Sequence, residues 1–210
     1  GCRVVQPVAP WHGHRAAPGR YGGEPIFAGG PMALLDFLHA GVLELGLLIA
    51  WARSLDDEPA ALGGVSLGAL TAQRLATAAH CWSAAMIPDA LLLVTASASI
   101  SAVGYTGSLP AALGVPEALE TAGWTQAKAE RWAPLLEPGG PPALDPARVV
   151  MILGDADDVL PYREGVALAD AWSIPDENRF VSRRGHFTTS LGIRYNDAPY
   201  RRLLGAMRLG

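Results

Sequence analysis

The chain has 210 residues, half of them hydrophobic and 17% charged, and its formal net charge is −4. This length suits one domain, which we expect to span residues 1–210, and the composition excludes an intrinsically disordered protein. The charge and the lack of a basic stripe exclude nucleic acid as an expected partner.

The first apolar run, 3–9, predicts a short strand that ends at Pro10. The opening residues lack a charged segment followed by a long apolar one, so they predict no signal peptide, and we favour a cytoplasmic location. They also lack a starting methionine, and we expect the natural N-terminus to lie upstream.

A long helix is predicted from Met32 to Trp51, and it is apolar enough to be tested as a membrane span. Asp36 and Glu44 lie near its middle, where each charge would cost about 2.5–3.5 kcal/mol in a bilayer. At 100° per residue they share a narrow stripe with His39, which fits a helix packed in a globular interior. We therefore predict no stable membrane span.

The elements after this helix alternate between strands and helices. The predicted strands are 60–65, 91–95, 149–153 and 179–181, and the predicted helices are 67–80, 163–172 and 198–209. Such alternation predicts an α/β fold with a mostly parallel sheet and helices on both faces.

An insertion rich in proline and glycine separates two of these strands, at about 97–147. It includes Trp124 and Trp132, and residues 117–134 within it have a helical pattern. A long insertion of this kind forms a lid or substrate wall, or else a surface excursion over one edge of the core. Both interpretations stay open here.

The pentapeptide from Gly64 to Gly68 matches the pattern G-x-S-x-G, with Ser66 at its centre. A strand-like run precedes it and a helical run follows, which is the setting of a nucleophile elbow. Glycines on both sides are expected to prevent collision between strand and helix. The backbone amide of Leu67 would then lie at a helix start, where it can donate to a developing oxyanion.

An acid is expected after the strand at 149–153, because carboxyl ends of parallel strands line the ligand crevice. Asp157 is favoured by a G-x-x-D pattern followed by an apolar residue and proline, while Asp155 and Asp158 stay open as alternatives. His186 follows the next strand and supplies an imidazole base. The order Ser66, Asp157, His186 is that of α/β-hydrolases.

The other histidines have simpler interpretations. His12 and His14 flank a glycine but lack the further ligands of a binuclear metal site, so we place them in a loop beside the active site. His39 and His80 are predicted to be structural. Two cysteines, Cys2 and Cys81, show no scaffold spacing. We expect no metal and no cofactor.

Several segments together resemble the α/β-hydrolase domain-containing protein 18 family. They are the run Ala9–Arg15 with Pro18, similar to "NP-aromatic-aromatic-G-x-R-x-P", the long helix carrying Glu44, the elbow at 63–68, and Asp157, Pro161, Trp172 and His186. The resemblance covers most of the chain, although the family's elbow usually reads G-x-S-M-G-G and here Leu67 and Ala69 differ.

The resemblance implies a serine hydrolase of esterase or lipase type. It also implies that residues 3–9 form the fourth strand of that fold, that the third strand is lacking, and that the loop supplying a second oxyanion amide is lacking with it. We therefore expect residues 1–210 to be the C-terminal portion of an α/β-hydrolase domain, without its N-terminal strands. Loss of one such donor costs about 10²–10³ in turnover.

We therefore expect hydrolysis of a small-molecule acyl ester through an acyl-enzyme on Ser66, with His186 as general base. Two alternatives stay open, a catalytically silent binding module of the same fold and an acyltransferase.

Overall fold

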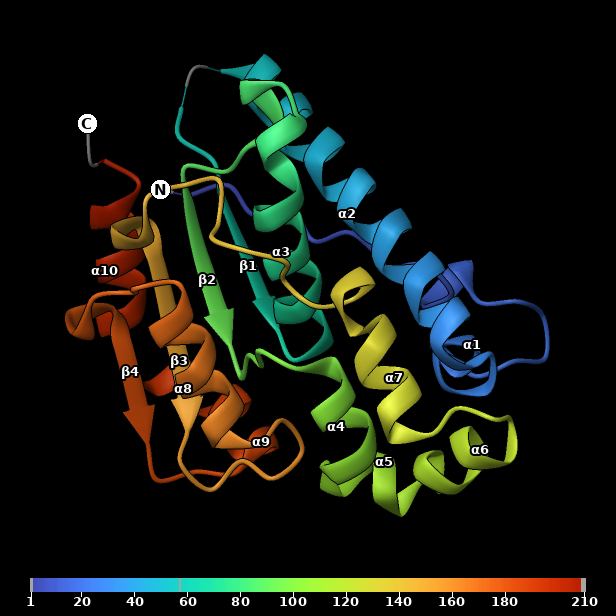
Figure 1. The fold of residues 1–210 in the computed structure, drawn as a ribbon. Coiled ribbons are helices and arrows are strands. Elements are labelled where there is room, and N and C mark those ends of the chain that lie inside the picture. The colour runs from blue at the N-terminus through green and yellow to red at the C-terminus, as the bar shows by residue number, and fades with distance from the viewer. Residues whose placement is uncertain (1, 57, 209–210) are drawn as a thin grey trace.

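The computed structural model describes residues 2–56 and 58–208, and its centre is a four-stranded parallel sheet (Figure 1). The strands are β1 (Ala61–Val65), β2 (Ala90–Val94), β3 (Val149–Gly154) and β4 (Arg179–Ser182), and they lie in the order β1-β2-β3-β4. All three neighbouring pairs are parallel. The predicted fold class is confirmed.

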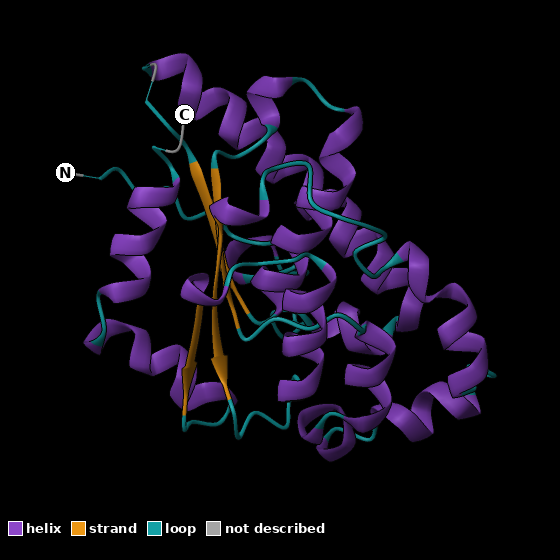
Figure 2. Ribbon diagram, turned by 60° about the vertical axis from the view of Figure 1, so that its left-hand side comes forward, coloured by secondary structure: helices purple, strands orange, loops and turns teal. Residues whose placement is uncertain are grey.

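Helices cover both faces of the sheet, which Figure 2 views nearly edge-on. Leu91 and Leu93 of β2 point to one face, where α3 (Leu67–Ala78) and α8 (Tyr162–Ala171) pack. Leu92 and Val94 point to the other face and lie in a cluster with Leu203 of α10 (Ala198–Ala206). Because β2 is buried on both sides, its sequence is apolar without alternation.

The remaining helical elements are short apart from α2 (Gly30–Leu55). They are η1 (Gly13–Arg15), α1 (Glu24–Ala28), η2 (Ala79–Cys81), η3 (Ala84–Met86), α4 (Ile100–Thr106), α5 (Ser108–Ala112), α6 (Val115–Thr121), α7 (Gln126–Trp132), η4 (Ala133–Leu135), η5 (Pro146–Arg148), η6 (Asp176–Asn178), α9 (His186–Gly192) and η7 (Ile193–Tyr195). The predicted closing helix ends at Ala206 in α10, and Leu209 lies outside the described residues.

The long helix α2 is confirmed, but it is not surrounded by protein as an interior helix would be. One face is buried against α3, including Leu38 and Val42, while Leu43, Leu47 and Trp51 are about half exposed. By length and composition alone α2 is apolar enough to cross a membrane. The absence of a membrane span therefore stays a prediction.

The predicted strand at 3–9 is wrong. This segment has no strand partner and is largely exposed, and the carbonyl of Val8 accepts a hydrogen bond from Arg15 instead of one from a sheet. Extended backbone becomes a strand only where a neighbour satisfies its hydrogen-bonding groups. The expected fourth strand is therefore not formed, and β1 is an edge strand of the sheet in the described chain.

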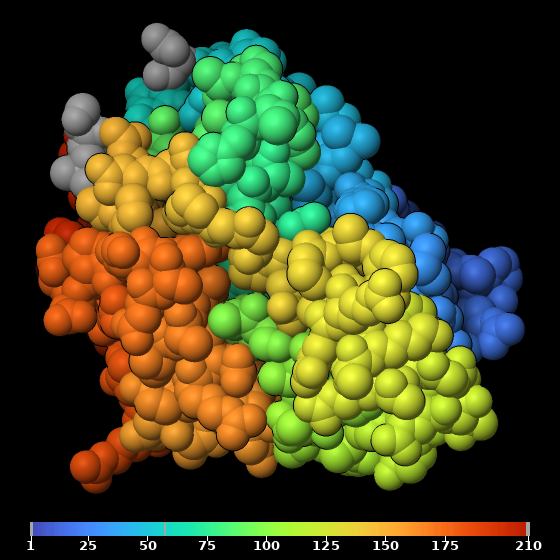
Figure 3. Space-filling model, in the orientation of Figure 1, coloured from blue at the N-terminus to red at the C-terminus, as the bar shows by residue number. Residues whose placement is uncertain are grey.

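The insertion between β2 and β3 folds as four short helices, α4 to α7, beyond the carboxyl ends of β1 and β2 (Figure 1). The helix predicted at 117–134 is interrupted, because Gly123 has a φ of +76° and ends α6 before α7 begins. The carboxylate of Glu137 accepts hydrogen bonds from Ser99 and Ser101, which ties the end of the insertion to its start. In Figure 3 these helices cover the lower right of the molecule.

The sheet's apolar layer predicts a large difference between two leucine truncations. Leu93→Ala removes a fully buried side chain and should lower the free energy of unfolding by about 2–5 kcal/mol. Leu43→Ala, at a side chain that is 52% exposed, should change it by less than about 0.5 kcal/mol. Urea unfolding measures both, and equal losses would contradict the described packing.

Candidate active site

Three strands have their carboxyl ends on the same side of the sheet, and each is followed by one of the predicted catalytic residues. Ser66 follows β1, Asp157 lies in the loop after β3, and His186 begins α9 after β4. Because the strands are parallel, their carboxyl ends lie on the same side. The topology thus brings together residues that are up to 120 positions apart in the chain.

Ser66 stands on a sharp turn between β1 and α3. Its φ of 53° and ψ of −118° are unusual for a residue with a side chain and store strain. Its N–H donates to the carbonyl of Val94 at 2.9 Å, and its carbonyl accepts from Leu70 at 3.0 Å. The backbone is held on both sides, so the hydroxyl is presented at the turn's apex.

Only one of the two elbow glycines prevents a collision. A Cβ at Gly64 would lie 2.2 Å from the carbonyl oxygen of Gly68, a distance that no real structure tolerates. A Cβ at Gly68 would meet no described atom within 4 Å. The expectation that a glycine is needed to prevent a collision between strand and helix is therefore right for Gly64 and wrong for Gly68.

Asp157 is the carboxylate that reaches the histidine. Its Oδ2 lies 2.8 Å from Nδ1 of His186, and its Oδ1 accepts from the backbone amides of Val159 and Leu160, each at 3.0 Å. The residue is 7% exposed. Three hydrogen bonds in a buried setting hold both oxygens in place.

The imidazole of His186 joins the acid to the serine. Its Nε2 lies 2.9 Å from Oγ of Ser66 while Nδ1 faces the carboxylate, and the residue is 6% exposed. An ionised carboxylate only accepts, so Nδ1 carries a proton and Nε2 is left to accept from the serine hydroxyl. This is the proton arrangement that a serine nucleophile requires.

The loops that carry the acid and the base are themselves hydrogen-bonded. The N–H of Asp155 donates to the carbonyl of Ser182, and the N–H of Ala156 donates to that of Arg184. A Cβ at Gly154 would lie 2.2 Å from the same Arg184 oxygen. The two loops are therefore held in close contact by backbone alone.

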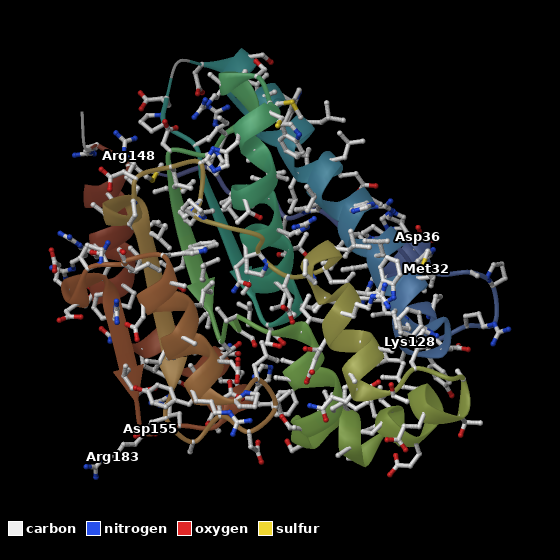
Figure 4. All side chains as sticks on the ribbon, viewed as in Figure 1. Met32, Asp36, Lys128, Arg148, Asp155 and Arg183 are labelled. Atoms are coloured by element: carbon white, nitrogen blue, oxygen red, sulfur yellow. The ribbon has the colours of Figure 1, made fainter. Side chains whose placement is uncertain are left out.

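The other two aspartates of the loop, both described residues, form no hydrogen bond with the imidazole, whose carboxylate partner is Asp157. Asp155 and Asp158 are both exposed, and Figure 4 shows Asp155 on the β4 side of the sheet, at the same outer corner as Arg183. Of the three acids that the sequence left open, the geometry selects Asp157 as the partner of His186.

The remaining histidines lie outside this group. Nδ1 of His12 donates a hydrogen bond to the carbonyl of Pro10, and Nε2 of His80 donates one to the carbonyl of Pro141. His14 and His39 are exposed. No group of three or more His, Cys, Asp or Glu side chains within residues 2–56 and 58–208 is arranged to hold a metal.

The loop at 9–15 packs beside α2, where the ring centroids of Trp11 and Phe37 are 6.3 Å apart. Ala9 and Trp11 contact an apolar cluster that Leu67, the residue after the serine, also contacts. That this loop lies beside the active site stays a prediction. Arg15 makes two hydrogen bonds to Glu44 of α2, at 2.6 and 2.7 Å, and these bonds lower the pKa of the Glu44 carboxyl. The loop is thereby fastened to α2.

An apolar pocket of about 210 Å³ opens next to Ser66. The residues that line it, which include Phe27, Leu70 and Trp124, come from α1 with the start of α2, from the elbow with α3, from the insertion at 100–136 and from the loop at 159–160. The sequence indicated an apolar insertion but could not identify these residues as lining one space, because they come from four separate segments.

Comparison with known proteins bears on the fold. The solved structure of TT1662 from Thermus thermophilus superposes with a TM-score of 0.53 over 96% of this chain and 76% of that chain, at 20% sequence identity. The chain has an α/β-hydrolase-like fold. A scan against models of protein families gave no match, and a search among curated proteins gave none either.

The elbow geometry predicts opposite outcomes for its two glycines. Gly64→Ala should destabilise the protein by about 1–3 kcal/mol or more, because the methyl group cannot fit against the Gly68 backbone. Gly68→Ala should fold normally and gain about 0.5–1 kcal/mol from helix propensity. Thermal or urea unfolding separates the two, and a tolerated Gly64→Ala would refute the close approach.

Proposed function

We propose that the protein is a serine hydrolase that cleaves carboxylic esters, with Ser66, His186 and Asp157 as its catalytic residues. The observation that carries the proposal is the chain of two hydrogen bonds from Asp157 through His186 to Ser66, at 2.8 and 2.9 Å. The strained turn at Ser66 and the apolar pocket beside it support the same conclusion.

The proposed reaction begins with attack of Oγ of Ser66 on the ester carbonyl, while Nε2 of His186 takes the hydroxyl proton. The tetrahedral intermediate collapses as the imidazolium returns that proton to the leaving alcohol, which leaves an acyl-serine. Water then attacks the acyl-serine with His186 again as base, and the acid and the free hydroxyl are released.

Asp157 acts on the imidazole and not on the substrate. It fixes the ring and its tautomer and stabilises the imidazolium that forms during each step. The backbone N–H of Leu67, the first residue of α3, is proposed to donate to the oxyanion, since amides at a helix start have no partner within the helix.

We also propose a relationship to the α/β-hydrolase domain-containing protein 18 family. Two residues of the segments that carry the resemblance, Arg15 and Glu44, form a bidentate ion pair here. Their pairing supports the idea that the loop and the long helix are one structural unit.

Ser66 should be labelled by a fluorophosphonate probe, because its hydroxyl has a base within hydrogen-bond distance. Ser66→Ala should abolish labelling and lower ester hydrolysis by at least about 10⁴-fold. Ser54→Ala, at an exposed residue of α2, is the matched control and should retain both. If Ser66→Ala kept its turnover, the proposal would be refuted; product analysis with added alcohols distinguishes hydrolysis from acyl transfer.

The three aspartates give a second test. Asp157→Asn should lower kcat by about 10⁴-fold, because an amide can impose the wrong tautomer on His186. Asp155→Asn and Asp158→Asn change exposed carboxylates and should stay within about threefold of the parent. A comparable loss in either control would mean that the acid has been misidentified.

A further inference from the structure

We propose that the pocket beside Ser66 binds the acyl group of the substrate and selects uncharged, medium-length chains, an inference that rests on the proposed function. The leaving alcohol is then held on the opposite, more open side, next to His186.

The position separates the acyl side from the alcohol side. Ser66 and Leu67 line the pocket, while His186 and Asp157 are not among the described residues that line it. The proton for the leaving alcohol comes from Nε2 of His186, so that alcohol must lie on the imidazole's side. The acyl chain, which stays bonded to Oγ, is left to enter the pocket.

The side of the leaving alcohol is exposed. Phe187 stands edge-on to the ring of His186, with centroids 5.3 Å apart, and is 62% exposed. Leu191, one turn further along α9, is 59% exposed. An alcohol in this position meets a surface and not an enclosing wall, so the structure supplies little selection there.

The residues that line the pocket disfavour an acyl group that carries a charge. Among the described residues that line the pocket none is charged, and its polar members are Ser66, Ser101 and Tyr105. The hydroxyl of Tyr105 already donates a hydrogen bond to the carbonyl of Trp124, at 2.7 Å. A carboxylate on the acyl chain would lose its hydration without finding a cation, which is strongly unfavourable.

The size limits the chain length. At about 30 Å³ for each water-sized group, 210 Å³ accommodates roughly seven carbon atoms. A second hollow of about 620 Å³ lies next to it between the 21–32 segment and α6, and Phe27, Leu119 and Trp124 line both. These side chains border both hollows, and we propose that they limit how far an acyl chain extends from Ser66.

The first test measures the hydrolysis of p-nitrophenyl esters by the unsubstituted protein. The value of kcat/KM should rise from acetate to hexanoate or octanoate by roughly three- to fourfold per methylene, and it should fall for palmitate. The hemiadipate ester, which has as many acyl carbons as hexanoate but ends in a carboxylate, should be at least about 100-fold slower. Butyrate esters of alcohols of increasing length should differ by less than about threefold.

The second test fills the pocket at a position that offers space. Gly104 of α4 lines the pocket, and a Cβ there would meet no described atom within 4 Å. Gly104→Leu should lower kcat/KM for octanoate by at least tenfold and leave acetate within twofold. Gly205→Leu on α10 is the matched control, because its Cβ also meets no described atom within 4 Å and it lies outside the pocket lining; its acyl profile should be unchanged.

The outcomes separate this inference from the proposed function. If Ser66 is not labelled and no ester is cleaved, the proposed function fails. If acetate is cleaved but the acyl profile is flat, if the alcohol series is the steep one, or if Gly104→Leu slows all esters equally, the pocket's assignment fails and the hydrolase activity stands.

Discussion

Strand β1 and helix α3 approach so closely at the elbow that a single methyl group on residue 64 would lie 2.2 Å from backbone. The turn that raises Ser66 out of the sheet exists only because glycine stands there. The positive φ of Ser66 is held by backbone hydrogen bonds to Val94 on the neighbouring strand and to Leu70 on the following helix. The position of the hydroxyl thus depends first on backbone packing, before any partner side chain is considered.

The partners reach Ser66 because the sheet is parallel and its last two strands are bound together at their ends. Backbone hydrogen bonds join Asp155 and Ala156 to the loop that precedes His186. Asp157 is fixed in turn by the amides of Val159 and Leu160. The imidazole is therefore positioned by main-chain contacts on one side and by a buried carboxylate on the other.

The apolar pocket has a different origin from the hydrogen-bonded group of Ser66, His186 and Asp157. These three residues follow strand ends, whereas the pocket is formed mainly by two excursions from the sheet, α1 with the start of α2, and the insertion α4–α7. The insertion is closed on itself by Glu137, which accepts from Ser99 and Ser101. Such segments can change without disturbing the sheet, so the pocket can vary independently of the proposed catalytic residues.

The sequence by itself predicted the elbow, the four strands of the sheet in chain order and the pair of Ser66 and His186, which the structure places within hydrogen-bond distance. These features depend on local patterns: apolar runs, a tight turn with glycine and an imidazole after a strand. It left three acids open and predicted a strand at 3–9 that is not formed. Which aspartate faces the ring depends on the path of one loop against another, and whether an extended segment becomes a strand depends on a neighbour to bond with. The pocket likewise exists only in the folded chain, since Leu70, Trp124 and Phe27 are distant in sequence and meet through packing alone.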